Sequence, residues 1–253
     1  MKRRFAIGVL AGIACTAIAA AGCTRRPAGV AQYFPLTPGM AWTFRFTGST
    51  GATGELTTTN QAPRQIFGFK SVPQQNSGGD KTYTEFYADD GTGIRHVAID
   101  ESEGLQSRLN DHSYVLKMPI SAGTSWREID RTFDGTVYDA TTRIESVNDN
   151  VSVPAGTFSG CLRIRSTGFA SMSKGTARAP RKAPSLRLVA GGQDMGGQDM
   201  GGQDMGGQDV GVEDYYWLAP SIGPVKATHQ ESRGEGSTAQ SIGFTLELEH
   251  LKR

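Results

Sequence analysis

Apolar residues at every second position are the feature that most restricts how this chain can fold. The segments M-A-W-T-F-R-F-T at 40–47 and S-I-G-F-T-L-E-L at 241–248 both follow this pattern. A period of two places apolar side chains on one face of a half-buried strand and polar side chains on the other. No amphipathic helix longer than two turns is evident. The sequence therefore predicts a mainly β chain whose sheet has one dry face and one wet face.

Turn residues separate the predicted strands. The stretch D-D-G-T-G at 89–93 lies between two strand-like segments and is the strongest local hairpin signal in the chain. The stretch N-D-N at 148–150 predicts a second hairpin. A further strand is predicted at 65–72, with its end at Pro73. Repeated hairpins of this kind predict a long antiparallel sheet.

The N-terminus has the pattern of an export signal. Basic residues at 2–4 precede an apolar region at 5–19, and A-A-G-C follows at 20–23. A transmembrane anchor needs about 20 strongly apolar residues, and this segment is shorter and contains glycines. The A-A-A sequence at 19–21 would also suit cleavage as an ordinary secretory signal, which would leave the following cysteine unmodified.

Small residues directly before Cys23 resemble the lipobox of bacterial lipoproteins. The resemblance implies cleavage before Cys23, acylation of its sulfur and attachment to a membrane of the cell envelope. Thr24, in place of aspartate, implies the periplasmic face of the outer membrane if the source is Gram-negative. We therefore expect a signal peptide at 1–22, a lipid-anchored tether at 23–31 and a β domain at 32–253.

Charge and cysteine usage restrict the partners. The signal contains three of the 26 Lys and Arg residues and none of the 25 Asp and Glu residues, so the mature chain has a net charge of −2. A nearly neutral chain is not expected to bind nucleic acid. With Cys15 in the signal and Cys23 acylated, Cys161 is the one remaining thiol. No internal disulfide is expected, and Cys161 is predicted to be a small strand residue.

A short repeat links two parts of the chain. The sequences P-L-T-P-G-M-A-W at 35–42 and P-I-S-A-G-T-S-W at 119–126 share P-[LI]-[ST]-x-G-x-x-W at an offset of 84 residues. Each precedes a predicted strand. Gly39 and Gly123 are expected to need positive φ, and Trp42 and Trp126 to be buried near the strand starts. A chance match is the alternative to related substructures.

Three motifs resemble those of a group of uncharacterised bacterial lipoproteins and secreted proteins. They are F-P-L-x-x-G-x-x-W at 34–42, V-P-A-G-T-F at 153–158, which contains Pro154 and Gly156, and W-x-A-P-x-I-G-x-V-K from Trp217. The resemblance implies a single curved antiparallel sheet, an open barrel or half-barrel similar to lipoprotein-carrier folds. It implies no known activity and no catalytic residues.

A long insertion at 171–212 departs from that family pattern. It contains a basic, proline-containing part followed by four copies of G-G-Q-D-[MV] at 191–210. Glycine pairs lose much backbone entropy on folding, and one apolar residue in five buries little surface, so the insertion is predicted to be a disordered, passive linker. The alternatives are an electrostatic clasp between its basic and acidic parts, or a calcium site formed by its aspartates. These are Asp194, Asp199, Asp204 and Asp209.

No catalytic motif is present, and no cofactor or metal is expected. The histidines are dispersed, so surface or hairpin positions are predicted for all four. They are His96, His112, His229 and His250. The acidic pair Asp89-Asp90 is expected to stabilise its turn. Tyr215 and Trp217 share a strand face, which predicts either barrel lining or an exposed binding platform.

Two functions remain open on this basis. The first is a non-enzymatic binding module, anchored to the membrane by its N-terminal lipid, in which an uncovered concave sheet face binds a hydrophobic ligand or an envelope protein. The second is a structural or interaction lipoprotein whose interior is filled by its own side chains. An apolar cavity of several hundred Å³ would favour the first, and a packed core the second.

Overall fold

The computed structural model describes residues 29–79, 81–100, 106–108, 113–131, 136–172, 210–233 and 240–253. The predicted signal peptide, Cys23 and the four G-G-Q-D-[MV] copies lie outside the described residues, apart from the last Val210. The elements are α1 (Val30–Tyr33), β1 (Ala41–Gly48), β2 (Thr53–Asn60), β3 (Arg64–Ile66), β4 (Phe69–Gly78), β5 (Lys81–Asp89), β6 (Gly93–Asp100), β7 (Gln106–Arg108), β8 (Tyr114–Lys117), β9 (Ser125–Arg131), β10 (Thr136–Val153), β11 (Gly156–Met172), β12 (Val210–Ala219), β13 (Gly223–Arg233) and β14 (Gln240–Lys252).

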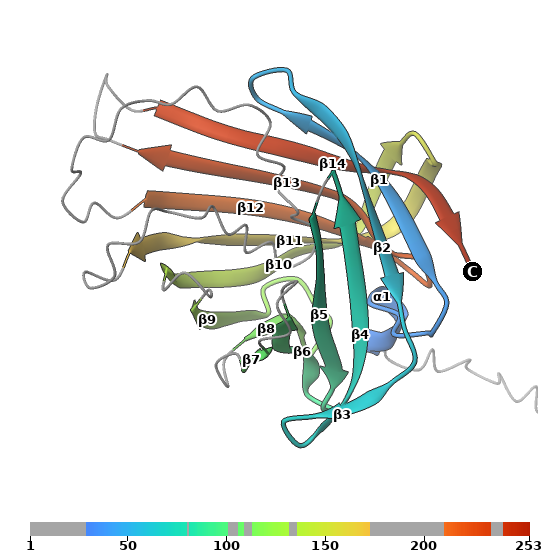
Figure 1. Cartoon of the computed structure of the whole chain (residues 1–253). Coiled ribbons are helices and arrows are strands. Elements are labelled where there is room, and N and C mark those ends of the chain that lie inside the picture. Colours follow the sequence, from blue (N-terminus) through green and yellow to red (C-terminus); the bar gives the residue numbers. More distant parts are fainter. Residues whose placement is uncertain are drawn as a thin grey trace, which may run out of the picture.

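These strands form one antiparallel sheet that curls into a nearly closed barrel (Figure 1). The hydrogen-bonded order is β7-β6-β5-β4-β2-β1-β14-β13-β12-β11-β10-β9, with β3 paired to β4 and β8 paired to β6. Strand β8, which lies beside β7 along β6, approaches the last strand, β9, and no backbone ladder joins the described parts of β8 and β9. The fold class predicted from the sequence, a single curved antiparallel sheet that stays open, is confirmed.

A tryptophan bridges the seam of the barrel. The Nε1–H group of Trp126, on β9, donates a hydrogen bond to the carbonyl oxygen of Tyr114, on β8, at 3.0 Å. Trp126 is buried, at 6% exposure. Side-chain packing and this bond therefore help to hold the two edges together where the described backbone groups form no ladder.

The interior of the barrel is filled by the chain itself. One cluster of buried side chains joins residues from both halves of the sheet, including Tyr87 and Ile94 from one half and Trp126 and Ile144 from the other. Phe34, which follows α1, is 1% exposed, and its ring packs edge-on against Tyr87 with the centroids 5.1 Å apart. The wall of the barrel opposite each strand, together with α1 and Phe34, therefore covers the concave apolar face.

Both copies of the repeat adopt the same local structure. Gly39 has a φ of 86° and Gly123 a φ of 92°, as expected for positions where a Cβ would be strained. The Gly39 N–H donates to the Asn60 carbonyl at 2.8 Å, and the Gly123 N–H donates to the Ile144 carbonyl at 2.8 Å. Like the glycines, these two acceptor residues lie 84 positions apart. Trp42 is the second residue of β1 and Trp126 the second residue of β9, and both are buried.

The three family-like motifs meet at one end of the barrel. The Trp42 indole N–H donates to the Ile222 carbonyl at 2.7 Å, and a Cβ on Gly223 would lie 3.1 Å from Pro35. The turn of the V-P-A-G-T-F motif bonds to β14, the strand that pairs with β1, since the Ala155 N–H donates to the Leu248 carbonyl at 2.9 Å. The motifs thus have a structural role in closing this end.

Two predicted boundaries are wrong. The N-D-N stretch at 148–150 is not a turn, because β10 continues through it with bulges. The chain reverses at Pro154 and Ala155, immediately before Gly156 (φ 133°). Bulges accommodate residues that do not fit the ladder, and here Arg163 pairs with Asp149 at 3.2 Å.

The predicted strand at 65–72 is in fact a hairpin. The chain turns at Phe67 and Gly68, which both have positive φ, and β4 runs on through Pro73. The Pro73 carbonyl accepts a bond from the Gln61 N–H. The N and C=O of one strand residue point to the same edge, so the missing N–H of Pro73 removes no ladder bond to β5.

The insertion is shorter than predicted at both ends. Strand β11 extends to Met172 and β12 begins at Val210, and Ala170 pairs with Val210. Residues 173–209 lie outside the described part of the chain, so its predicted disorder stays a prediction. Cys161 is fully buried on β11, as expected for a small strand residue.

Candidate functional site

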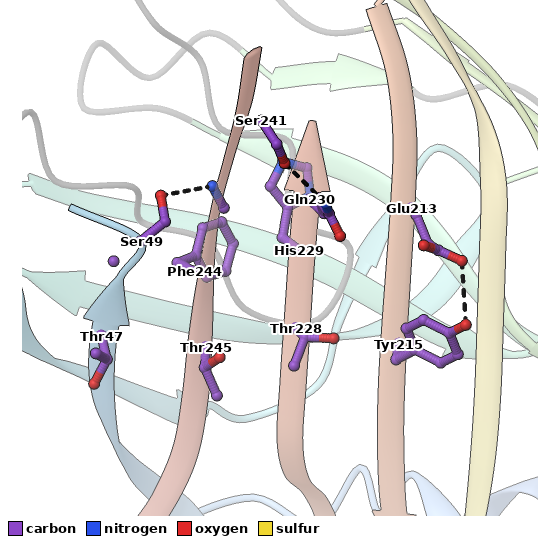
Figure 2. Close-up of a pocket in the computed structure, with 12 residues that line it drawn as sticks. Thr47, Ser49, Glu213, Tyr215, Thr228, His229, Gln230, Ser241, Phe244 and Thr245 are labelled. Carbon is purple, nitrogen blue, oxygen red and sulfur yellow. Dashed lines mark hydrogen bonds between the residues drawn. The ribbon is translucent and has the colours of Figure 1, made fainter. Parts of the chain in front are cut away.

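Four adjacent strands place a row of hydroxyl groups on the outer face of the barrel. Thr47 of β1 pairs with Thr245 of β14, Thr245 pairs with Thr228 of β13, and Thr228 pairs with Tyr215 of β12. Figure 2 shows these side chains in line across the sheet. Some neighbours along the strands, such as Tyr216 and Leu246, point to the interior and are buried. The pairing register of the four strands brings these residues together, and no single segment of the sequence contains the row.

A groove lies along this row, with a volume of about 490 Å³. Its floor includes Gly48 and Gly243, which have no side chains to fill it. A Cβ on Gly243 would lie 2.3 Å from the His229 carbonyl oxygen, so the close approach of β13 and β14 requires glycine there. Ser49 and Gln230 form part of the walls. The groove is open, and most of its lining residues are polar, but the lining also includes His229 and the apolar Phe244.

The one carboxylate lining the groove is held in place by its neighbours. Arg165 contacts the Glu213 Oε1 atom with its NH2 group at 2.6 Å, and the Tyr215 hydroxyl donates to the same oxygen at 3.1 Å. Burial, and then the hydrogen bond to Glu213, raise the pKa of Tyr215. The hydrogen bond to Glu213 is the main cause that raises the pKa of Arg165. The charge of Glu213 is therefore balanced within the site.

Tyr215 and Trp217 form an aromatic pair at the β12 side of the groove. Their ring centroids lie 6.0 Å apart with an interplanar angle of 24°. Of the two arrangements predicted from the sequence, lining of the barrel interior is wrong for Tyr215, because it faces the groove. Trp217 is half-buried and packs partly against the core. The Tyr215 ring is thus accessible from the groove, whereas the Trp217 ring is partly packed against the core.

A second polar cluster lies on the inner wall and borders the groove at His229. The His229 Nδ1 atom lies 2.6 Å from Asp214, and its Nε2 atom lies 3.4 Å from Glu231. Burial lowers the pKa of His229, but hydrogen bonds to Asp214 and Glu231 outweigh it and raise the pKa to about 9. His229 is therefore charged at neutral pH. Its ring stacks on Phe244 with the centroids 5.0 Å apart.

A polar chain also lines the opposite inner wall. Thr58 donates to Asn76 at 2.6 Å, and Asn76 donates to Glu85 at 3.0 Å. His96 lies 3.7 Å from Glu85 and stacks on Tyr87 with the centroids 4.8 Å apart. The predicted surface or hairpin positions are wrong for His96 and His229, because both side chains point inside the barrel.

The remaining predicted positions have simpler roles. His250 is exposed and His112 lies outside the described residues. Asp90 accepts bonds from the Thr92 N–H at 2.9 Å and the Tyr114 hydroxyl at 2.6 Å, so it stabilises its turn as expected. Burial raises the pKa of Asp90, but these bonds outweigh it and lower the pKa overall.

Nothing in the described part of the chain points to a metal centre or a membrane-spanning helix. No group of three or more His, Cys, Asp or Glu side chains there could hold a metal ion. No helix in that part is long and apolar enough to cross a membrane.

We expect the free energy of unfolding to fall between pH 6.5 and 9, and His229→Gln to remove that dependence. The folded-state pKa of His229, about 9, lies above the ordinary value of 6.5. A raised histidine pKa adds stability that is fully present below the unfolded-state pKa and is lost as the pH rises through the folded-state pKa. The loss should be on the order of 1–3 kcal/mol, since one pKa unit corresponds to about 1.4 kcal/mol.

Urea unfolding at several pH values measures this effect. His250→Gln is the matched control, because His250 is exposed, and it should keep the pH dependence of the unmodified chain. Parallel pH profiles for His229→Gln and the unmodified chain would show that the cluster does not act this way.

Comparisons with known proteins identify no family for the chain. No family model and no curated protein matches it. A solved structure from Bacteroides fragilis, provisionally named an exported protein with a YmcC-like fold, is 11% identical, with a TM-score of 0.49 over 87% of this chain and 99% of that chain. A second, provisionally named a lipoprotein, from Parabacteroides distasonis, is 13% identical, with a TM-score of 0.39 over 87% of this chain and 98% of that chain. Neither name states a ligand or an activity.

Proposed function

We propose that the chain is a lipid-anchored protein of the bacterial envelope that binds its partner on the outside of a filled barrel and performs no catalysis. The observation that carries the proposal is the filled interior, because it leaves the outer face as the surface for recognition. The export pattern and Cys23 support the location in the cell envelope. Acylation with two or more chains would hold the protein stably at the membrane.

The groove supports binding more than catalysis. Acid–base chemistry usually needs a second titratable group near the first. Glu213 is the one carboxylate in the groove lining, and it is already bound by Arg165 and Tyr215. His229 also lines the groove, but Asp214 and Glu231 already engage both of its ring nitrogens. The groove therefore presents hydrogen-bonding groups in a fixed array without an evident acid–base pair.

The fold removes the reason for which a hydrophobic ligand was expected. That expectation rested on a concave apolar face that the chain could not cover. In the described residues the opposite wall and Phe34 cover it, and neither the outer groove nor the small hollow beside Tyr138 is an apolar cavity of several hundred Å³. The filled interior favours the alternative of a packed core. A hydrophobic ligand stays an untested prediction, and an envelope component bound outside is what we propose.

The anchor is tested by the intact mass of protein extracted from membranes. We expect a chain that begins at Cys23 and carries acyl groups, and we expect Cys23→Ser to leave the membrane fraction. In a Gram-negative source the acylated form should sediment with the outer membrane, because Thr24 follows the cysteine. A mature chain that begins at Gly22, or an unmodified Cys23, would exclude the anchored function.

A further inference from the structure

The outer groove offers an unusual concentration of neutral hydrogen-bonding groups. Thr47, Thr228 and Thr245 each provide one donor and two acceptor sites, and Gln230 provides an amide at the wall. Adjacent strands lie about 4.8 Å apart, so the row from Thr47 to Tyr215 extends over about 14 Å. A ligand matched to this row is elongated and has hydroxyl or amide groups at intervals along its length.

The electrostatics of the groove disfavour a charged ligand. Glu213 is its one carboxylate, and Arg165 neutralises it from outside the groove lining. The groove lining also includes His229, whose ring is already held between Asp214 and Glu231. A phosphate would find no unpaired cation among the lining residues, and a polyamine would find no unpaired anion there. Charged ligands need such partners to offset their desolvation.

The aromatic pair adds a flat apolar surface to this polar row. Tyr215 lies at the end of the hydroxyl row, and Trp217 stacks with its ring at a centroid distance of 6.0 Å. Arg165 lies 5.7 Å from the Tyr215 ring centroid and also holds Glu213, so the ring is fixed before any ligand arrives. A preorganised ring loses little entropy on binding.

We propose that the groove binds a neutral oligosaccharide. A sugar ring has hydroxyl groups around its edge and C–H groups on its face, so it can bond to the threonine row while one ring packs on Tyr215. The groove volume of about 490 Å³ lies within the range of small-ligand sites. This inference rests on the proposed function and deepens it, since it names the chemical class bound by the outer face.

Isothermal titration calorimetry on the full chain tests the proposal. The membrane-extracted protein is kept in a detergent whose head group is not a sugar, and is titrated with cellohexaose, with N-acetylated chitohexaose and with sodium phosphate. We expect at least one hexasaccharide to bind and phosphate not to bind. Failure of both hexasaccharides to bind, or binding of phosphate alone, would overturn the proposal.

A matched pair of variants locates the site. Thr228→Val removes one hydroxyl from the middle of the groove and keeps a β-branched side chain of similar shape. Thr57→Val makes the same change on β2, on the same outer face but outside the groove. We expect Thr228→Val to weaken hexasaccharide binding about tenfold, the equivalent of one neutral hydrogen bond, and Thr57→Val to leave it unchanged.

Equal affinities in the two variants would place the binding elsewhere and overturn the assignment. Unfolding midpoints of both variants, measured alongside, show whether a change in affinity reflects the groove or the fold. The intact mass of the same sample reports the state of Cys23. A chain that is acylated but binds no oligosaccharide would therefore refute this inference alone and leave the membrane anchor intact.

Discussion

Trp42→Ala should lower the free energy of unfolding by about 3–5 kcal/mol, the range found when a buried aromatic ring is removed from a packed core. Trp42 is 1% exposed and lies where the three family-like motifs meet. Its indole N–H bonds to the Ile222 carbonyl at 2.7 Å, and a Cβ on Gly223 would lie 3.5 Å from the ring. Truncation leaves a cavity and an unpaired carbonyl at the closed end of the barrel. Urea unfolding followed by circular dichroism measures the loss.

Trp42→Phe separates the two contributions. It keeps an aromatic ring and removes the N–H donor, so the Ile222 carbonyl loses its partner. We expect a cost of roughly 1–3 kcal/mol, smaller than that of alanine. A loss below about 1 kcal/mol for Trp42→Ala would mean that the ring does not pack as described.

Local patterns in the sequence were sufficient for the fold class. The alternation at 40–47 corresponds to β1, where Trp42 and Phe44 are buried, and the pattern at 241–248 corresponds to β14, where Leu246 and Leu248 are buried. The repeat also predicted the positive φ of Gly39, because a turn of this type needs a residue without a Cβ whatever surrounds it. Such features depend on a few neighbouring residues.

The errors arose where distant contacts override local preference. The residues N-D-N at 148–150 favour a turn, yet β10 passes through them because β11 pairs with it on both sides of the bulges. Asp149 gains an ion pair with Arg163 there. Pro73 was predicted to end a strand. A proline is tolerated in a strand if its nitrogen points to an edge where no ladder bond is needed, and the pairing of the strand decides which edge that is.

The candidate site shows the same limit more strongly. Thr47 and Thr245 are separated by almost the whole domain, and only the register of β1 with β14 makes them neighbours. Likewise His229 meets Asp214 because β12 and β13 pair, whereas no spacing along the chain indicates it. The period of two predicts that Tyr215 and Trp217 share one face of the strand. Whether that face lies inside or outside depends on how the barrel closes.

The seam of that barrel leads to the second large effect that we expect. Trp126→Ala should also cost about 3–5 kcal/mol, and it should act on a different part of the molecule from Trp42→Ala. The Trp126 ring is buried between β9 and the β6–β8 edge, and its N–H donates to Tyr114. No backbone ladder joins the described parts of β8 and β9, so the Trp126 side chain helps to hold these edges together.

Hydrogen exchange distinguishes opening of the seam from general loss of stability. In Trp126→Ala, the amides of β8 and β9 should exchange faster than the change in global stability explains, because these strands can separate while the other ladders stay intact. Trp42→Ala, of similar expected cost, is the matched control, and its exchange should rise evenly over the sheet. Trp126→Phe keeps most of the packing and should open the seam less. If Trp126→Ala and Trp42→Ala gave the same exchange pattern, the barrel would unfold as one unit and Trp126 would be an ordinary core residue.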